Sequence, residues 1–583
     1  MRTKKTSARA RPQASANTVQ PAALDLAEHR DGAPLRRAPR GNGASLAASF
    51  EAIAKGVLLQ PLTSLKGAGR AGAALMDVAI GRSTRTPAPN DRRFDDPAWR
   101  DNPLYRSLMQ GHLALVQEAQ RVVGELGLSE RDEARAKMAL GMATDTLAPT
   151  NTLLGNPAAL KRTLETAGAN LVQGAMQLVA DWRHNGGLPA SVDGTNFEVG
   201  GNLAITPGSV VYRSELLELI EYRAQTAEVH GTPLFIVPPQ INKFYIWDLA
   251  PGRSLIEYLV QQGFQVFVVS WFDPDTSRSA WGLETYVQAL VQAMEVTREI
   301  AGAEQLHVLG ACSGGITAAA LLAYLAAQDK DWARSLTLMV SILDIDGIAD
   351  SSMGLFAHLE TLELARAVSG RNGVLQGKDL AKVFAWLRPN ELIWNYWVNN
   401  YLMGRKPPAF DILYWNSDTT RLPAHLHGDF IKLLKSNALV RRGGLSIGEV
   451  PLSLADVQCD SYILAGRTDH ITPWEGCYQT RGLLGGHSDF VLTGSGHVQS
   501  IVSPPGGKKS AFMTNAGRHA TPGEFEATAG QHEGSWWPHL AGWLAARSEP
   551  PRRAPRQEGT AAHPPLCAAP GTYVLAGAQS QAA

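Results

Sequence analysis

The sequence contains few cysteines, and they do not have the spacing of metal ligands. The four of them are Cys312, Cys459, Cys477 and Cys567, and no two form a CxxC pair. The first residues also lack the apolar core of a secretory signal peptide. We therefore expect a cytoplasmic protein in a reducing compartment, where Cys312 remains a free thiol and neither a metal nor a redox cofactor is bound.

Long hydrophobic runs and an excess of charge of one sign are also missing. The longest apolar run, residues 316–327, is too short to span a bilayer and is typical of a buried helix. The 54 basic and 54 acidic side chains cancel, so the overall charge gives no indication of nucleic-acid binding. With 44% hydrophobic and 19% charged residues, the composition is that of a soluble globular protein.

The two ends of the sequence differ in composition from its middle. Residues 1–40 carry nine Lys/Arg against three Asp/Glu among many Ala, Pro, Ser and Gly, which indicates a solvated arm or, alternatively, an arm that adheres to an anionic surface. We expect residues 1–90 to be a mostly disordered basic extension with one amphipathic stretch at 46–62. Residues 549–583, rich in Pro, Ala and Arg, are likewise expected to be a disordered tail.

The pattern between these ends predicts two domains and one insertion. Helical periodicity dominates residues 91–200, which we interpret as a helical N-terminal domain. In residues 201–548 short apolar strands alternate with helices, as in a mainly parallel α/β sheet covered on both faces. The alternation stops at about 347–448, a segment rich in Trp, Tyr and Asn. This insertion is either a lid over an active site or a structural subdomain.

One glycine-rich turn carries the clearest chemical signal. Gln305–Leu309 has the pattern of a buried strand, and Gly310-Ala-Cys-Ser-Gly-Gly315 follows it and leads into a helix. This is the pattern of a Gly-x-Ser-x-Gly nucleophile elbow with Cys312 in place of serine. Centring the motif on Ser313 would require a glycine where Ala311 stands. Because a thiolate leaves more readily than an alkoxide, the turn favours passing an acyl group between thioesters and hydroxyls.

Two later loops offer an acid and a base in the order expected of an α/β-hydrolase sheet. Asp469 follows an apolar strand in Ala465-Gly-Arg-Thr-Asp469, and His497 follows the next strand in Thr493-Gly-Ser-Gly-His497. We predict that His497 is the general base and that Asp469 either orients it or acts on a substrate hydroxyl. His470 is the competing base, although its position beside the acid disfavours it. Cys459 and Cys477 lack the glycine frame and are expected to be buried thiols.

The oxyanion hole is expected to combine two backbone N–H groups. One belongs to Ser313, the residue after the nucleophile, and the other to the loop after the strand that ends at Val237. That loop begins with Pro238 and Pro239, which have no N–H to donate. The second donor is therefore Gln240, Ile241 or Asn242, and we take Ile241 as the candidate.

Further short motifs extend the pattern from about Asp91 to Leu544. They are Asp91-Arg-Arg-Phe94, Asn102-Pro-Leu-Tyr-Arg106, Asn202-Leu-Ala204, Thr206-Pro-Gly208, Pro238-Pro-Gln-Ile-Asn-Lys-Phe-Tyr245, Tyr414-Trp-Asn-Ser-Asp418 and Gly496-His497. With the elbow, this ensemble resembles the polyhydroxyalkanoate synthase family, whose members polymerise 3-hydroxyacyl-CoA into storage polyester. The family places its nucleophile, acid and base at the positions matching Cys312, Asp469 and His497.

The resemblance implies more than the residues alone show. It implies an α/β-hydrolase fold with a helical N-terminal domain and a cap, (R)-3-hydroxyacyl-CoA as substrate, CoA as product and no cofactor. It further implies an active homodimer that associates with polyester granules in the cytoplasm. The motifs are closest to the single-subunit, medium-chain-length (class II) type. Ser270-Trp-Phe-Asp-Pro274 departs from the usual Arg-Asn after the Trp, which bears on monomer preference rather than on the reaction.

Two other functions remain open at this point. A cysteine-elbow hydrolase, such as a thioesterase or a dienelactone-type enzyme, would release CoA without making an insoluble product. A non-catalytic granule-coating protein would carry a Cys312 that is inert towards thiol reagents.

Overall fold

The computed structural model describes residues 46–348, 351, 354–355, 359–507, 510–515, 517 and 521–576. The strongly basic arm predicted at the start of the chain lies outside the described residues. Its possible attachment to an anionic surface stays a prediction.

Residues 46–79, which fall within the extension predicted to be mostly disordered, form two helices; the first lies in the predicted amphipathic stretch 46–62, and the prediction of disorder is wrong for the second. They are α1 (Leu46–Leu59) and α2 (Pro61–Ala79). In α2, a Cβ added to Gly67 would lie 2.2 Å from a methyl carbon of Val122 in α4 (Pro103–Glu125). Arg70 also pairs with Glu118 of α4 at 3.0 Å. Composition alone does not reveal that a second helix covers this segment.

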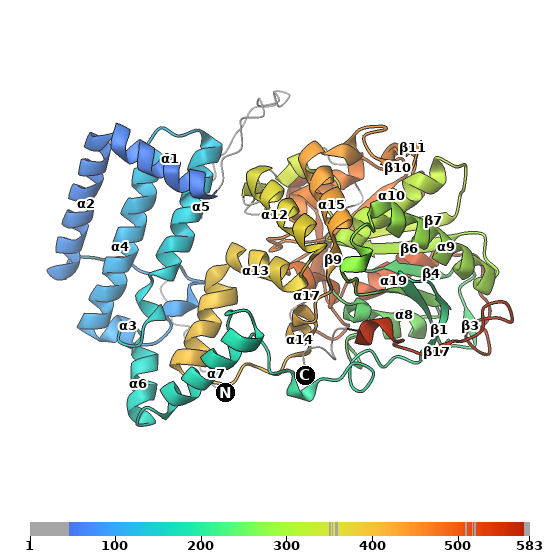
Figure 1. The fold of residues 1–583 in the computed structure, drawn as a ribbon, viewed down its shortest axis with the longest axis horizontal. Helices are drawn as coiled ribbons and strands as arrows, with labels where there is room; N and C mark the ends of the chain where they lie inside the picture. Colours follow the sequence, from blue (N-terminus) through green and yellow to red (C-terminus); the bar gives the residue numbers. More distant parts are fainter. Residues whose placement is uncertain are drawn as a thin grey trace, which may run out of the picture. The chain divides into compact units, whose positions relative to one another are not determined.

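The following helices begin at residues that cap their free N–H groups. Asn102 accepts from the first turn of α4, Ser129 from that of α5 and Asn156 from that of α6. The helices of this region, drawn in blue and cyan in Figure 1, are α3 (Ala98–Asp101), α4, α5 (Glu130–Thr146), α6 (Pro157–Glu165) and α7 (Ala169–His184). Their placement follows the helical periodicity of the sequence.

Eleven strands of the described residues form one sheet, in the order β15-β14-β13-β12-β7-β6-β4-β5-β2-β1-β17. The six central strands, β5 to β13 in this order, run parallel, and the outer ones are antiparallel. Their bounds are β1 (Gly208–Arg213), β2 (Leu217–Tyr222), β4 (Leu234–Val237), β5 (Val266–Trp271), β6 (Leu306–Ala311), β7 (Ala333–Met339), β12 (Asp460–Gly466), β13 (Ser488–Thr493), β14 (Ala511–Thr514), β15 (Gly530–Glu533) and β17 (Cys567–Ala568).

Each face of the sheet is covered by a separate apolar core. Along β4, Phe235 and Val237 join one core while Leu234 and Ile236 join the other, as the two-residue period of a strand requires. Helices α9 (Leu283–Ala301) and α10 (Ser313–Ala326) contribute to the first core, and α8 (Leu255–Gln261) and α19 (Trp537–Ala545) to the second. Strands β4, β5 and β6 are consequently buried throughout, which is why they read as mainly apolar runs.

The insertion between β7 and β12 is mainly helical. Its helices are α12 (Leu359–Asn372), α13 (Gly377–Leu387), the π-helices η7 (Asn390–Trp394) and η8 (Trp397–Leu402), α14 (Asp411–Ser417) and α15 (Ala424–Ser436). Its aromatic run contacts the N-terminal helices: the Tyr401 hydroxyl donates to Asp181 of α7 at 2.7 Å, and Trp397 donates to the Asn151 carbonyl at 3.1 Å. These aromatics thus join two parts of the fold.

Residues 549–576, predicted to be a disordered tail, are ordered, and that prediction is wrong for them. Arg552–Arg553 (β16) pair with β3 (Glu228–Val229), and β17 pairs with β1 at the edge of the main sheet (Figure 1, red). The physical reason lies far away in the sequence. Buried Glu218 of β2 accepts hydrogen bonds from Thr572 N, Thr572 Oγ1 and Tyr573 N. Residues 577–583 lie outside the described part of the chain.

None of the helices in the described ranges combines the length and the apolar character that crossing a membrane requires.

Candidate active site

Cys312 occupies the turn between β6 and α10, in a backbone conformation that few residues adopt. Its φ is 50° and its ψ is −125°. Holding a residue other than glycine there costs on the order of 1–3 kcal/mol, so surrounding bonds must fix it. Cys312 N donates to the Met339 carbonyl at 3.0 Å, and the Cys312 carbonyl accepts from Gly315 N at 3.0 Å and from Ser341 Oγ at 3.1 Å. The structure therefore holds the turn on both sides of the thiol.

The glycines of the elbow are required by close approach between backbones. A Cβ on Gly310 would lie 2.8 Å from the Gly314 carbonyl oxygen. A Cβ on Gly314 would lie 2.4 Å from the Val237 carbonyl oxygen and 2.5 Å from that of Pro238. The start of α10 thus lies directly against the end of β4, where the predicted oxyanion loop begins.

Asp469 and His497, predicted from separate loops, lie together at the carboxyl ends of their strands. Asp469 follows β12, and His497 is the first residue of α17 (His497–Ile501), after β13. Asp469 Oδ2 and His497 Nδ1 are 2.6 Å apart. The other carboxylate oxygen, Oδ1, accepts from the backbone N–H groups of Ile471 at 2.8 Å and Thr472 at 3.0 Å. The carboxylate is therefore fixed in orientation before it contacts the imidazole.

The electrostatics of the pair favour the charged form of both groups. Burial raises the pKa of Asp469, but the charge of His497 and hydrogen bonds from His497 and Thr472 outweigh it, so the net pKa is lowered. Burial lowers the pKa of His497, whereas Asp469 and then Cys312 raise it more, to about 10. Cys312 is among the groups that raise the pKa of His497, so the third predicted residue lies near the pair.

His470, the competing base, does not fill that role in the structure. Both of its ring nitrogens are buried and have no hydrogen-bond partner among the described residues. Burial first, and then the charge of Arg388, lower its pKa to about 4. No carboxylate orients the ring, although Asp469 is its neighbour in sequence.

The loop after β4 offers backbone donors towards the elbow. Gln240 N donates to Ser313 Oγ at 3.3 Å, which occupies that N–H. Within the described part of the chain, no hydrogen bond is donated by the N–H of Ser313, Ile241 or Asn242. Free N–H groups beside a nucleophile are the arrangement that stabilises an oxyanion, so Ser313 with Ile241 stays our predicted pair and Asn242 stays the alternative to Ile241.

Sequence reasoning missed several residues that support the site. Thr472 Oγ1 donates to Asp469 Oδ2 at 2.6 Å and lies 3.1 Å from His497 Nδ1. An Asp followed three residues later by Thr is a recognisable local turn pattern and gave a usable signal. By contrast, Trp271 Nε1 donates to the Pro238 carbonyl at 2.9 Å across 33 positions, and no local sequence pattern predicts this hydrogen bond.

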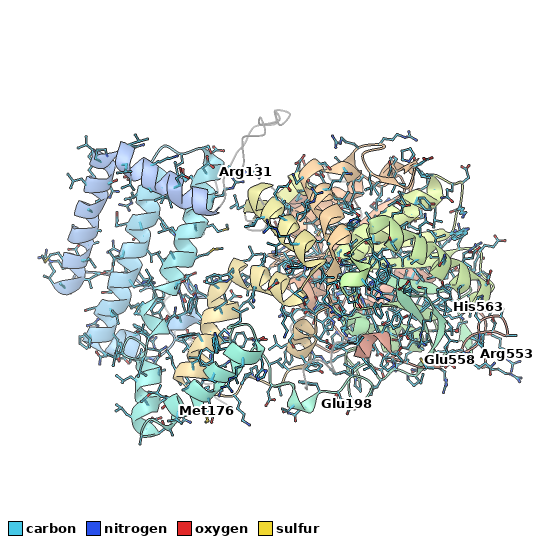
Figure 2. All side chains as sticks on the ribbon, in the orientation of Figure 1. Arg131, Met176, Glu198, Arg553, Glu558 and His563 are labelled. Carbon is cyan, nitrogen blue, oxygen red and sulfur yellow. The ribbon has the colours of Figure 1, made fainter. Side chains whose placement is uncertain are left out.

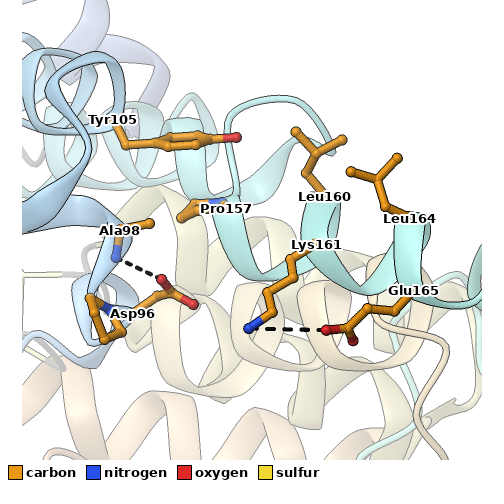
Figure 3. A pocket seen from close by; sticks show the side chains of 9 residues that line it. Asp96, Ala98, Tyr105, Pro157, Leu160, Lys161, Leu164 and Glu165 are labelled. Atoms are coloured by element: carbon orange, nitrogen blue, oxygen red, sulfur yellow. Dashed lines mark hydrogen bonds and ion pairs between the residues drawn. The ribbon is translucent and has the colours of Figure 1, made fainter.

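The described residues also contain an open pocket of about 530 Å³, far along the chain from the elbow. Figure 3 shows it between α3, α4 and α6, with Tyr105, Leu160 and Leu164 on its wall and the Lys161–Glu165 pair at its rim. It contains no nucleophile with a base. The part of the chain that the structure describes has no cluster of three His, Cys, Asp or Glu side chains that could hold a metal ion.

Both the helical N-terminal part and the α/β part of the chain match models of known protein families. A family model described as the N-terminus of poly-beta-hydroxybutyrate polymerase (PhaC) matches residues 90–259, and one described as the alpha/beta hydrolase fold matches residues 233–504. Poly(3-hydroxyalkanoate) polymerase 1 of Ectopseudomonas oleovorans is 47% identical over 529 residues, which cover 91% of this chain and 94% of that protein. The chain belongs to the poly(3-hydroxyalkanoate) polymerase family.

Other members of the polymerase family are similar over nearly the same span. Polymerase 2 of Ectopseudomonas oleovorans is 46% identical, with 91% of this chain and 95% of that protein covered. The polymerase subunit PhaC of Cupriavidus necator is 36% identical, with 86% and 85% covered. The resemblance drawn from the motifs is thereby confirmed, as is the α/β-hydrolase fold, and the polymerases are enzymes of the acyltransferase type.

Proposed function

We propose that this protein polymerises (R)-3-hydroxyacyl groups from their CoA thioesters into polyhydroxyalkanoate, releases CoA and carries the acyl chain on Cys312. The observation that carries the proposal is a thiol on a nucleophile elbow, in electrostatic contact with a His497 that is bound to a buried Asp469. A serine elbow would suit hydrolysis of robust esters, whereas a thiol keeps the acyl group at thioester energy.

In the first half of the reaction the Cys312 sulfur attacks the thioester carbonyl while His497 holds the thiol proton. The tetrahedral oxyanion forms against the N–H groups of Ser313 and Ile241, each worth roughly 3 kcal/mol of barrier. When the intermediate collapses, the bond between the carbonyl carbon and the CoA sulfur breaks. His497 gives its proton to the departing CoA, and the acyl group stays on Cys312.

In the second half the 3-hydroxyl of the next monomer attacks the carbonyl carbon of the acyl-Cys312 thioester, and the bond from this carbon to the Cys312 sulfur breaks. His497, oriented by Asp469, accepts the hydroxyl proton and returns it to Cys312 as the sulfur departs. The product is a chain longer by one unit that still ends in a CoA thioester. Cys312 then attacks this thioester, so each added unit releases one CoA. Asp469 accepts from three donors besides His497, which favours an orienting role over direct action on the hydroxyl.

Water must be kept from the acyl-cysteine, since otherwise the enzyme becomes a thioesterase. The aromatics of the insertion contact the N-terminal helices, so they support this exclusion only indirectly. The side chains nearest the chemistry are themselves shielded, with Asp469 fully buried and His497 12% exposed. Granule association in the cytoplasm, an active homodimer and a preference for medium-length monomers complete the proposal and rest on the family resemblance.

The test is to measure CoA release and polymer mass with C4 and C10 (R)-3-hydroxyacyl-CoA. We expect wild type to release CoA and form insoluble polyester, faster with C10, and Cys312→Ala to do neither. Polymer formed by Cys312→Ala would refute the role of the thiol. CoA released by wild type without polymer would identify a thioesterase instead, and a Cys312 inert to iodoacetamide would identify a non-catalytic protein.

A further inference from the structure

Residues 549–576, here called the strap, run along one edge of the sheet and are tied to it at many points. Glu558 pairs with Arg223 at 2.7 Å, and Gly559 N donates to Glu221 at 2.6 Å. Arg553, Glu558 and His563 of this segment are labelled in Figure 2. The strap is therefore bound by charged side chains of β2 and of the residue that follows it, and not by apolar packing alone.

The last described residues of the strap lie on Lys243, whose side chain is 2% exposed. Lys243 Nζ donates to the Val574 carbonyl at 2.6 Å and to the Ala576 carbonyl at 2.5 Å, and it lies 3.9 Å from Asp418. A buried ammonium group is costly unless acceptors surround it. Burial lowers the pKa of Lys243 and Asp418 opposes this, so the strap carbonyls supply two of the acceptors that keep the ammonium in place.

Lys243 is also part of the loop that faces the nucleophile, two residues after Ile241. The loop is held on its other side by carbonyl contacts: Thr420 N donates to Ile241 O at 2.9 Å, and Trp415 Nε1 donates to Lys243 O at 2.7 Å. The N–H of Ile241 has to stay free for the reaction, so it cannot fix the loop. The position of this N–H therefore depends on side chains and carbonyls around it.

We propose that the strap is a positioning element for acyl transfer: through Lys243, the carbonyls of Val574 and Ala576 hold the oxyanion loop at its distance from Cys312. This role rests on the proposed function. Lys243 and the strap act through the backbone of the loop.

The contact between Lys243 and the strap can be removed by changing either partner. Lys243→Met removes the ammonium and keeps most of the volume, and a stop codon after Tyr573 removes both carbonyls while leaving the bonds from Thr572 and Tyr573 to Glu218. The matched controls are a stop after Gly577, which keeps both carbonyls as peptide groups, and Lys330→Met, which removes an ammonium that stacks on Trp332.

Two reactions of Cys312, CoA release and alkylation, distinguish a loss of loop positioning from a loss of folding. CoA release passes through an oxyanion, whereas alkylation of Cys312 by iodoacetamide does not. Because loss of an oxyanion donor costs about 100-fold to 1000-fold in kcat, we expect misplacement in either variant to slow CoA release by about 10-fold to 100-fold. Alkylation should stay within about twofold of wild type, and the double variant should lose no more than the single ones because both remove one contact.

Each outcome bears on a different statement. Unchanged CoA release in Lys243→Met, or a parallel fall of alkylation and CoA release, would overturn the positioning role. Additive losses in the double variant would show that Lys243 and the strap act separately and would overturn it too. Wild type that releases no CoA would refute the proposed function itself.

Discussion

At the scale of single residues, the protonation of His497 determines the electrostatics of the site. The pKa of His497 is raised to about 10 by Asp469 and Cys312, against the effect of burial. At neutral pH this favours the imidazolium form of His497 beside the carboxylate of Asp469. Asp469 contributes by its charge and by its orientation.

The raised pKa of His497 makes stability depend on pH in a defined direction. The folded protein holds the proton more tightly than the unfolded chain, so the stabilisation is complete below about pH 6.5 and is lost as the pH rises towards 10. We expect the free energy of unfolding of wild type, relative to His497→Gln, to fall between about pH 6 and about pH 10. Urea denaturation of both proteins at several pH values measures it. A difference that does not change with pH would contradict the pairing.

Substitution can distinguish the roles of His497 and His470, the two candidate bases. Asp469→Asn replaces the carboxylate that orients His497, and removal of such an acid costs about 10⁴-fold in kcat in the serine-protease triad. We expect a loss of about 10³-fold to 10⁴-fold in CoA release for Asp469→Asn and for His497→Gln, and a far smaller one for His470→Gln. Steady-state kinetics checks this. Equal losses for the two histidines would make His470 a second base.

The residues of the candidate triad were readable from sequence because each follows a strand on a short loop. Local order along the chain predicts which loops meet at one edge of the sheet. Thr472 and Trp271 differ in how far their contacts could be predicted: the first lies in a local turn after Asp469, and the second reaches its partner from the neighbouring strand. The backbone geometry and the pKa of His497 depend on distances that a sequence does not contain.

At the scale of elements, the contact between β4 and α10 sets how near the oxyanion loop lies to the thiol. An added methyl group at Gly314 would meet two carbonyl oxygens of Val237 and Pro238, which are backbone and cannot rotate away. We expect Gly314→Ala to destabilise the protein by about 1–3 kcal/mol and to lower CoA release by about 100-fold or more. Thermal unfolding and CoA release measure the two effects.

The control for this prediction is another helical glycine. Gly542 in α19 has open space around its would-be Cβ. Gly542→Ala should leave CoA release unchanged and stabilise the protein by about 0.5–1 kcal/mol, as alanine does in a helix interior. If the two variants behaved alike, close approach would not be the reason for glycine at 314.

Elements with their own apolar period were predicted, and elements stabilised from a distance were not. The strand before Cys312 and the helix after it follow from a buried run and a glycine turn. Helix α2 depends on Val122 and Glu118, and the strap depends on Glu218, Glu221 and Lys243. A segment rich in proline and alanine is predicted to be disordered from its composition. It becomes ordered when buried charged groups elsewhere in the chain require it as a hydrogen-bond partner.

At the scale of the whole described chain, the insertion and the N-terminal helices form one packed unit. A Cβ on Gly174 of α7 would lie 2.0 Å from the Tyr401 carbonyl oxygen, and Asn170 donates to the Leu402 carbonyl at 2.7 Å. The aromatic composition of the insertion is compatible with a lid over the active site and with a structural subdomain. Trp397 and Tyr401 contact the N-terminal helices, which composition alone does not predict.

Weakening this contact should loosen both partners. Tyr401→Phe leaves buried Asp181 without one donor, at a cost of about 1–3 kcal/mol. We expect faster hydrogen exchange in α7 and η8 but unchanged exchange in β6 and β7. Gly141→Ala, in open space on α5, is the control. Equal acceleration throughout the sheet would show that the effect is global unfolding instead.

The pairing of β17 with β1 has a consequence for solubility. Leu566 N donates to the Val210 carbonyl at 2.8 Å and Ala569 N to the Gly208 carbonyl at 2.9 Å, so two outward-facing acceptors of β1 are already occupied. An uncovered strand edge is a template on which a second chain can add its own strand. A chain cut before residue 566 would expose such a template beside a large apolar core, and its first defect would be self-association into aggregates.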